Sequence, residues 1–224
     1  TQRKAKKKPQ REMPSWLRYV IAGIIAFLFL AAFFYFFIRP YSYRWKPCYG
    51  FKAYGVCMPS GFQVHGIDVS HYQGNIDWKM LTQTRQGKFP IHFVFMKASE
   101  GGDYGDKAFI TNFDSAKTHG FIRGAYHFYN PKTDPIRQAD FFINSVKLDS
   151  GDLPPVLDIE KRGKDENQLR RDLKLWLDKI EQHYKVKPIL YTSYKFKTRY
   201  LNDSVFNSYP YWIAHYYVDS VEYR

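Results

Sequence analysis

Six short apolar runs, separated by stretches of helical periodicity, are the feature of this sequence that most restricts its fold. The runs are rich in β-branched and aromatic residues and cover residues 66–70, 91–98, 121–129, 154–160, 188–193 and 211–216. Between them, apolar residues recur at three- and four-residue steps, most clearly over residues 167–184. This alternation of strand and helix predicts a parallel sheet with crossover helices, either open or closed into a barrel.

The segments between the runs favour a barrel over a nucleotide-binding sheet. Asp134 followed by Pro135 predicts a helix start, because Asp caps free N–H groups and Pro fits the first helical position. No glycine-rich phosphate loop follows any predicted strand, which disfavours a nucleotide-binding fold. We therefore expect an α/β fold, a TIM-like (β/α) barrel, with its chemistry at the carboxyl ends of the strands.

A stretch of twenty residues without a charge, Tyr19 to Ile38, precedes the predicted barrel. A helix needs about 20 apolar residues to cross a hydrocarbon core of roughly 30 Å. Seven Lys and Arg residues come before this stretch, and such charges favour the cytoplasmic side. We therefore expect a single transmembrane helix with everything after Arg39 exported. A cleaved signal peptide is the alternative, although its apolar region is usually only about 7–15 residues long.

The net charge of +13 comes from the N-terminal region. Residues 1–65 contain 11 Lys and Arg against one acid, whereas the remaining 159 residues contain 23 basic and 20 acidic residues. No basic stripe interleaved with aromatic residues appears in the later part, so we expect no nucleic-acid partner. The chain divides accordingly into a basic cytoplasmic tail (1–18), the transmembrane helix (19–38), a linker (39–65) and the barrel domain (66–224).

The two cysteines, Cys48 and Cys57, both lie in the region expected to be exported. Nine residues apart in an oxidising compartment, they would close a small loop as a disulfide. Two free thiols are the alternative. A zinc site would need more ligands than the one histidine nearby, His65.

Two acids, Asp158 and Glu160, end an otherwise apolar predicted strand. Because side chains alternate along a strand, Val156, Asp158 and Glu160 are expected on one face. Repulsion and partial burial of neighbouring carboxylates should raise the pKa of at least one of them, as a general acid requires at neutral pH.

A third acid, Asp68, lies on the first predicted strand, and a barrel brings strand ends together over one pocket. Two or three converging carboxylates are typical of glycoside hydrolysis. The same acids would also suit a Mg²⁺ or Ca²⁺ site, so the residues alone leave a metal-dependent hydrolase open. Lys97 and Glu100 are spaced to form an ion pair that orients the site.

Six motifs in this order resemble glycoside hydrolase family 25, the Chalaropsis-type lysozymes or N-acetylmuramidases. They are Gly66–Gly74 with Ile76–Trp78, Phe93–Gly101, Gly120–Phe128, Pro155–Glu160, Leu190–Ser193 and Tyr211–Tyr216. Each motif alone is weakly specific, but six in order across residues 66–216 are highly specific.

The resemblance implies a flattened βα barrel that hydrolyses the β-1,4 bond between N-acetylmuramic acid and N-acetylglucosamine in peptidoglycan. On the matching positions, Glu160 is implied as the general acid and Asp158 as the carboxylate that assists the substrate's acetamido group. Asp68 is implied as a third acid of the catalytic site. The substrate-binding residues implied at the strand ends are Tyr126, Tyr191 and Glu100. The family needs no metal or other cofactor.

Taken together, the resemblance and the apolar segment predict a lysozyme anchored in the bacterial cytoplasmic (inner) membrane, with its catalytic domain on the exported side. The chain departs from the family pattern at its end. Family members usually continue with Trp-Gln-Tyr and Asp-x-Asn segments that close the barrel, whereas here six of eight expected strands precede Arg224. We expect a truncated sequence. The alternative function is a glycan-binding module of the cell envelope with weak or no turnover.

Overall fold

The computed structural model describes residues 14–39, 51–53, 56–58 and 62–214, in two compact units that divide between Tyr49 and Gly50. The first unit is one helix, α1 (Ser15–Phe33), which continues as a π-helical turn over Phe34–Ile38. No residue of α1 is buried, and the helix is long and apolar enough to cross a membrane. A signal sequence would meet the same criteria.

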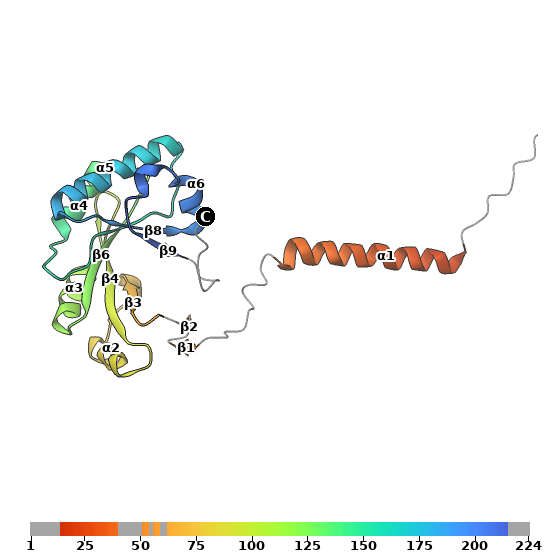
Figure 1. Ribbon diagram of the computed structural model, residues 1–224, viewed down its shortest axis with the longest axis horizontal. Helices are drawn as coiled ribbons and strands as arrows, with labels where there is room; N and C mark the ends of the chain where they lie inside the picture. Colours follow the sequence, from red (N-terminus) through yellow and green to blue (C-terminus); the bar gives the residue numbers. More distant parts are fainter. Residues whose placement is uncertain (1–13, 40–50, 54–55, 59–61, 215–224) are drawn as a thin grey trace, which may run out of the picture. The chain divides into compact units, whose positions relative to one another are not determined.

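The second unit is built on a curled sheet whose six parallel strands follow one another in chain order (Figure 1). They are β3 (His65–Val69), β4 (Ile91–Glu100), β6 (Ile122–Phe128), β7 (Val156–Asp158), β8 (Ile189–Ser193) and β9 (Tyr211–Ala214). All six predicted strands are confirmed. The architecture is an α/β half-barrel, and β3 and β9 form its two ends within the described residues.

Two smaller β elements accompany the main sheet. A short strand, β5 (Tyr104–Gly105), pairs antiparallel with the end of β4. In the region expected to be a linker, β1 (Phe51–Ala53) and β2 (Val56–Met58) form an antiparallel hairpin. The predicted pairing of Cys48 with Cys57 lies outside the described side chains, as do residues 215–224.

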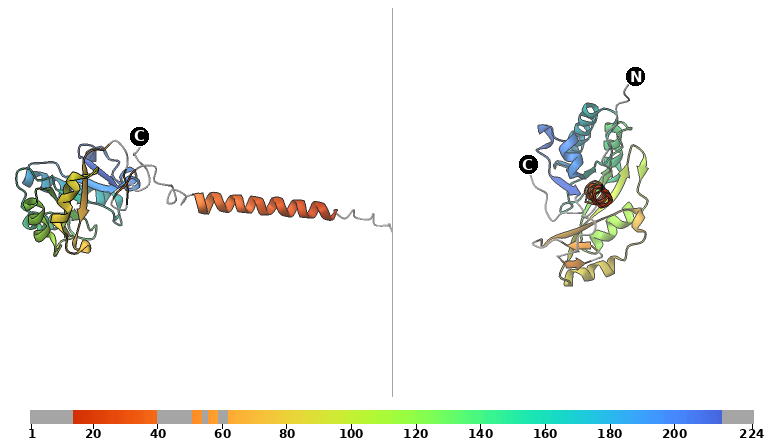
Figure 2. Two further views of the ribbon diagram at one scale, coloured as in Figure 1. Left: turned by 90° about the horizontal axis from the view of Figure 1, so that it is seen from below. Right: turned by 90° about the vertical axis from the view of Figure 1, so that its right-hand side faces the viewer.

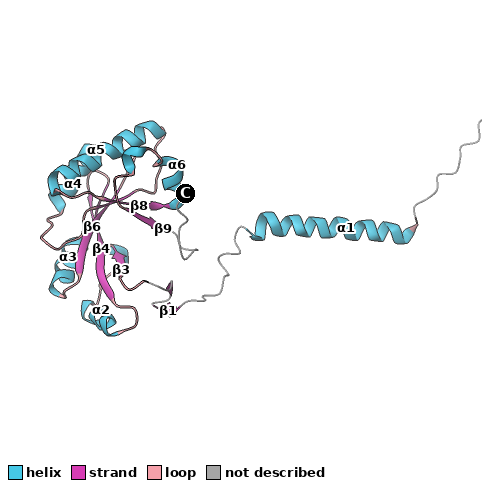
Figure 3. Ribbon diagram, in the orientation of Figure 1, coloured by secondary structure: helices cyan, strands magenta, loops and turns pink. Residues whose placement is uncertain are grey.

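The helices cover the outer face of the curled sheet (Figure 3). They are α2 (Trp78–Gln83), α3 (Phe109–Thr118), α4 (Pro135–Ser145), α5 (Glu166–Tyr184) and α6 (Tyr194–Tyr200), with 3₁₀ turns at His71–Gln73, Thr84–Gln86 and Ser204–Phe206. Right-handed crossovers that always step in the same direction along a parallel sheet place every helix on one face. Two further views show the same layering (Figure 2).

The helix signals in the sequence are confirmed. The Asp134 side chain accepts a hydrogen bond from the N–H of Arg137 at 2.8 Å, and Pro135 occupies the first turn of α4. The apolar stripe of α5 is buried throughout; it comprises Leu169, Leu173, Trp176, Leu177 and Ile180. These side chains form the main core with strand residues such as Leu157 and Leu190.

Aromatic rings occupy the inner face near the amino ends of the strands. Phe95 lies 5.2 Å from Trp212 of β9, measured between ring centroids. Two glycines make room for such rings: a Cβ on Gly66 would lie 2.1 Å from the Phe93 ring, and one on Gly124 would lie 2.3 Å from the Phe95 ring. With rings filling this end, the polar side chains of the inner face gather at the carboxyl end.

We predict that Gly124→Ala destabilises the second unit by about 1–3 kcal/mol, because overpacking displaces a ring in a filled interior. The double variant with Phe95→Ala should lose less stability than the sum of the losses in the two single variants, since removing the ring removes the collision. Urea unfolding of the four proteins measures this coupling. Gly105→Ala, where the nearest atom is 3.9 Å away, is the control. Additive losses would contradict the proposed packing.

Candidate active site

A pocket of about 150 Å³ lies at the carboxyl ends of the parallel strands. Its lining comes from five strands and the segment after β7: Asp68, Tyr126, Val156, Asp158, Glu160, Tyr191 and Trp212. Parallel strands end at the same edge of the sheet, so residues far apart in sequence meet here. The structure thus brings together the three acids and both tyrosines that the sequence had singled out.

Asp158 is the buried member of the site. It ends β7, in register between Phe128 of β6 and Tyr191 of β8, and is only 9% exposed. Its Oδ1 atom has no hydrogen-bond partner among the described residues. A buried carboxylate oxygen without a donor is costly in a folded protein, so this oxygen is available to an incoming N–H or O–H group.

Glu160 lies just beyond the strand and is exposed. The expectation that the strand extends to this residue is wrong, because β7 ends at Asp158. The intervening Ile159 is still fixed: its N–H donates to the Tyr191 carbonyl at 2.9 Å, and its carbonyl accepts from Thr192 Oγ1 at 2.6 Å. Glu160 therefore follows a rigid residue and reaches the same pocket as Asp158.

The electrostatics of the site centre on Asp158. Burial, reinforced by the negative charge of Glu160, raises the pKa of Asp158 to about 8. Asp68 is open to solvent on one side and surrounded by protein on the others, and this desolvation raises its pKa above the usual range. Burial and the charges of Asp68 and Asp158 also raise the pKa of Tyr126, so its phenol stays a hydrogen-bond donor.

Lys97 and Glu100 form the predicted ion pair, with Nζ and Oε2 2.6 Å apart. A bulge in β4 between Lys97 and Ser99 shifts the pairing with β6. Strict alternation would place Lys97 and Glu100 on opposite faces, but the extra residue brings them to the same one. Glu100 does not line the pocket. Its pair with Lys97 is close enough for both charges to act on the pKa of Asp158, the Lys97 charge lowering it and the Glu100 charge raising it.

Trp212 is a pocket residue that the sequence analysis did not single out. It packs edge-on against Tyr191, with ring centroids 4.8 Å apart, and against Phe95 below. The run 211–216 had predicted the strand but not which of its alternate residues face inward. The pairing of Trp212 with Tyr191 across β8 and β9 fixes that choice.

A larger cavity of about 540 Å³ lies at the opposite ends of the strands, beside the loop between α4 and β7. Its acids are already paired, since Arg123 contacts Asp152 at 2.8 Å and Asp149 at 2.9 Å. Within the described part of the chain, no group of three or more His, Cys, Asp or Glu side chains is placed to hold a metal ion. The smaller pocket is therefore the candidate active site.

Comparison with known proteins identifies similar chains. The family model described as glycosyl hydrolases family 25 matches residues 67–224. YegX of Escherichia coli K12 is 37% identical over 176 residues, which cover 78% of this chain and 63% of YegX. Lysozyme M1 of Streptomyces globisporus is 33% identical over 175 residues, covering 70% of this chain and 56% of the relative. The chain thus spans less than two thirds of the length of these curated relatives.

Solved structures give the same result for the fold. A family 25 glycosyl hydrolase from Bacillus anthracis superposes with a TM-score of 0.60 at 31% identity, covering 66% of this chain and 68% of the other. A bacterial lysozyme from Streptomyces coelicolor gives a TM-score of 0.59 at 31% identity, with coverages of 67% and 73%.

The raised pKa of Asp158 predicts a pH-dependent stability. Between the ordinary value of 3.8 and about 8, the folded protein keeps a proton that the unfolded chain has released, so the free energy of unfolding falls as the pH rises. Asp158→Asn removes this dependence. The Tm of the variant minus the Tm of wild type should therefore increase between pH 5 and pH 8.5. The increase should be about 2–4 °C for each kcal/mol by which the free energy of unfolding of wild type falls.

Thermal unfolding of both proteins across this pH range measures the effect. Asp103→Asn, at a carboxylate whose side chain is 80% exposed, is the matched control. A Tm difference between Asp158→Asn and wild type that stays constant with pH would contradict the raised pKa.

Proposed function

Because the chain belongs to family 25 of the glycosyl hydrolases, we propose that it is a lysozyme. Its reaction is hydrolysis of the β-1,4 bond between N-acetylmuramic acid and N-acetylglucosamine in peptidoglycan. The observation that carries this proposal is the pair of acids lining one pocket, Asp158 buried with an unbonded oxygen and Glu160 exposed beside it. Two carboxylates in different surroundings are what glycoside hydrolysis uses.

In this proposal Glu160 is the general acid. Its exposed side chain reaches the pocket mouth, where the leaving oxygen of a bound glycan would lie. Asp158 accepts the N–H of the substrate's acetamido group at its free oxygen, and this hydrogen bond favours the charged form of Asp158. Glu160 donates its proton to the leaving oxygen as the glycosidic bond breaks. Water then supplies the hydroxyl group that ends on the anomeric carbon, and its remaining proton returns to Glu160.

The other site residues hold the sugar. Asp68 supplies a third carboxylate at the pocket mouth, and Tyr126 and Tyr191 provide a phenol and a ring on the pocket wall. Glu100 lies outside the pocket, so we assign it, through its ion pair with Lys97, to orienting the site. Of the residues proposed to act, none requires a metal or other cofactor.

Glu160→Gln should lower kcat by about 10²–10⁴-fold while leaving sugar binding largely intact, because only the transferable proton is lost. Reducing-end analysis of digested peptidoglycan measures turnover and names the bond cut; pull-down on insoluble peptidoglycan measures binding. Glu166→Gln, at an exposed glutamate in the first turn of α5, is the matched control.

A loss below tenfold would contradict the role given to Glu160. Binding by wild type without any release of reducing ends would instead favour the glycan-binding module. Loss of activity on adding a chelator would favour a metal-dependent hydrolase.

We further propose that residues 19–38, within the long apolar helix Ser15–Ile38, are a single-pass anchor in the bacterial cytoplasmic membrane. The basic residues before this segment favour retention of the tail in the cytoplasm, with the enzyme domain on the exported side, where peptidoglycan lies. The helix presents apolar side chains on all sides, as a lipid-exposed span requires.

A reporter that is active only after export should be active when fused after Arg224 and inactive when fused ahead of Thr1. Fractionation should recover the uncleaved fusion from membranes, because the helix is not removed. A shortened, soluble product would identify the helix as a signal peptide, and cytoplasmic activity of the C-terminal fusion would overturn the topology.

A further inference from the structure

Three cations follow directly after the proposed general acid. Lys161, Arg162 and Lys164 occupy the loop between Glu160 and α5, and all three are exposed. No carboxylate among the described residues lies within 4 Å of any of their charged groups. We call this segment, Lys161–Lys164, the cationic loop.

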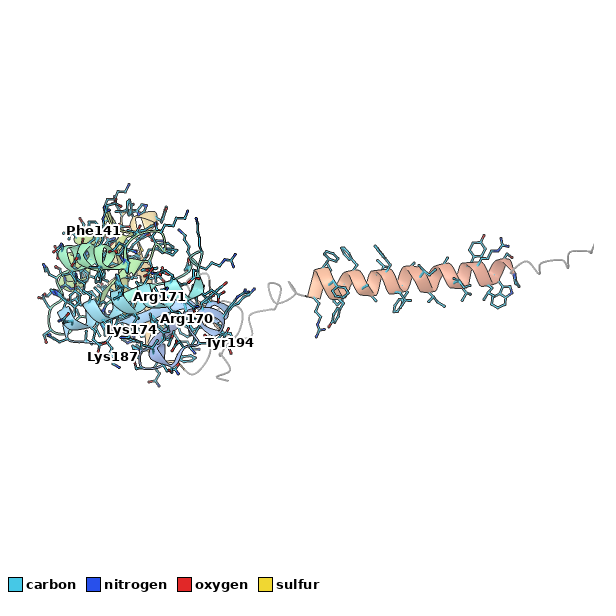
Figure 4. All side chains as sticks on the ribbon, turned by 90° about the horizontal axis from the view of Figure 1, so that it is seen from above. Phe141, Arg170, Arg171, Lys174, Lys187 and Tyr194 are labelled. Carbon is cyan, nitrogen blue, oxygen red and sulfur yellow. The ribbon has the colours of Figure 1, made fainter. Side chains whose placement is uncertain are left out.

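Three cations of α5, by contrast, have partners. Lys179 pairs with Asp140 at 2.7 Å, and Lys174 pairs with Asp178. Arg170 donates from Nε to the Tyr200 carbonyl at 2.9 Å. Figure 4 labels Arg170 and Lys174 along α5. The cationic loop is a cluster of three exposed cations in one short segment, with no carboxylate partner among the described residues.

The loop is held at the rim of the pocket rather than projecting away from it. Lys161 Nζ lies 4.7 Å from the centre of the Phe128 ring, and Phe128 is the β6 neighbour of Asp158. A Cβ built on Gly163 would lie 3.6 Å from Pro131, so the loop also packs against the segment that follows β6. These contacts hold Lys161 near Asp158 and pack the backbone of the loop beside the segment after β6, while Arg162 and Lys164 follow in the same loop as exposed charges.

The pocket beside this loop is lined by acids. Its volume is about 150 Å³, and three acids line it, Asp68, Asp158 and Glu160. In peptidoglycan, a peptide stem with free carboxylates leaves the lactyl group of N-acetylmuramic acid. The carboxylates of such a stem carry no charge complementary to the acids of the pocket, whereas the cations at its rim are complementary to them.

We propose that the cationic loop binds the carboxylates of the peptide stem, so that the protein prefers peptide-bearing glycan strands to bare ones. This inference rests on the proposed function. Lysine and arginine pair readily with carboxylates, and charges at the rim of a cleft raise the encounter rate with an oppositely charged substrate. The preference identifies the substrate as peptide-substituted peptidoglycan.

The test compares kcat/KM of the full chain on two substrates: soluble peptidoglycan strands with intact stems, and the same strands stripped of peptide by an amidase. The measured quantity is the ratio of the two values. For Lys161→Gln, Arg162→Gln and Lys164→Gln combined, this ratio should fall about tenfold at low salt, as expected for three exposed ion pairs. The double variant Arg162→Gln with Lys164→Gln, which leaves Lys161 beside Glu160, should give an intermediate ratio.

The matched control removes the same charge elsewhere on the unit, with Lys79→Gln, Arg171→Gln and Lys185→Gln, all exposed positions. Its ratio should equal that of wild type. A wild-type ratio near one, or an equal fall on both substrates in the loop variant, would overturn the inference while leaving the lysozyme activity in place. Absence of cleavage of either substrate by wild type would instead refute the proposed function.

Discussion

The burial of one carboxylate, Asp158, is the constraint on which the rest of the site depends. Its free oxygen and its raised pKa have the same origin: the group has been removed from water without being given a partner. A strand that carries such a group must be stabilised by other interactions. Val156, Leu157 and Ile159 are fully buried around it, so apolar packing offsets the unfavourable position of the acid.

The half-barrel places apolar packing and polar site residues at different ends of its strands. Near the amino ends, Phe93 and Phe95 fill the inner face, and Gly66 and Gly124 let the rings approach the backbone. At the carboxyl ends the inner face is polar. Because the strands are parallel and in chain order, every carboxyl end contributes to one edge, and the pocket needs no long loop to assemble it.

Much of this fold is predictable from local sequence patterns. Each strand follows an apolar run, and α5 follows the spacing of its buried stripe, because a strand or helix against a core must place its apolar residues periodically. The cap at Asp134 is equally local. The short strand β5 is exposed, has no apolar run and pairs only with the end of β4, so no such pattern predicts it.

The site was less predictable, since it depends on register. The sequence placed Asp158 and Glu160 on one face, and both line the pocket, although β7 ends between them. The pairing of β9 with β8 determines which residues of β9 face inward, and it places Trp212 in the pocket. The position of Glu100 depends on the bulge in β4, and the alternation of side chains along a single strand does not predict a bulge.

Register also explains how an acidic pocket and a cationic rim coexist. The sheet fixes Asp158 at the end of β7, and the chain leaves the sheet within two residues, at Glu160. The charges beyond that point lie in a loop and are exposed to water. Screening in solution limits exposed charges to a range of about 8 Å, whereas a buried carboxylate is screened far less. On the proposed function, the loop can therefore attract an anionic strand at the surface, while burial remains the main influence on the pKa of Asp158 below it.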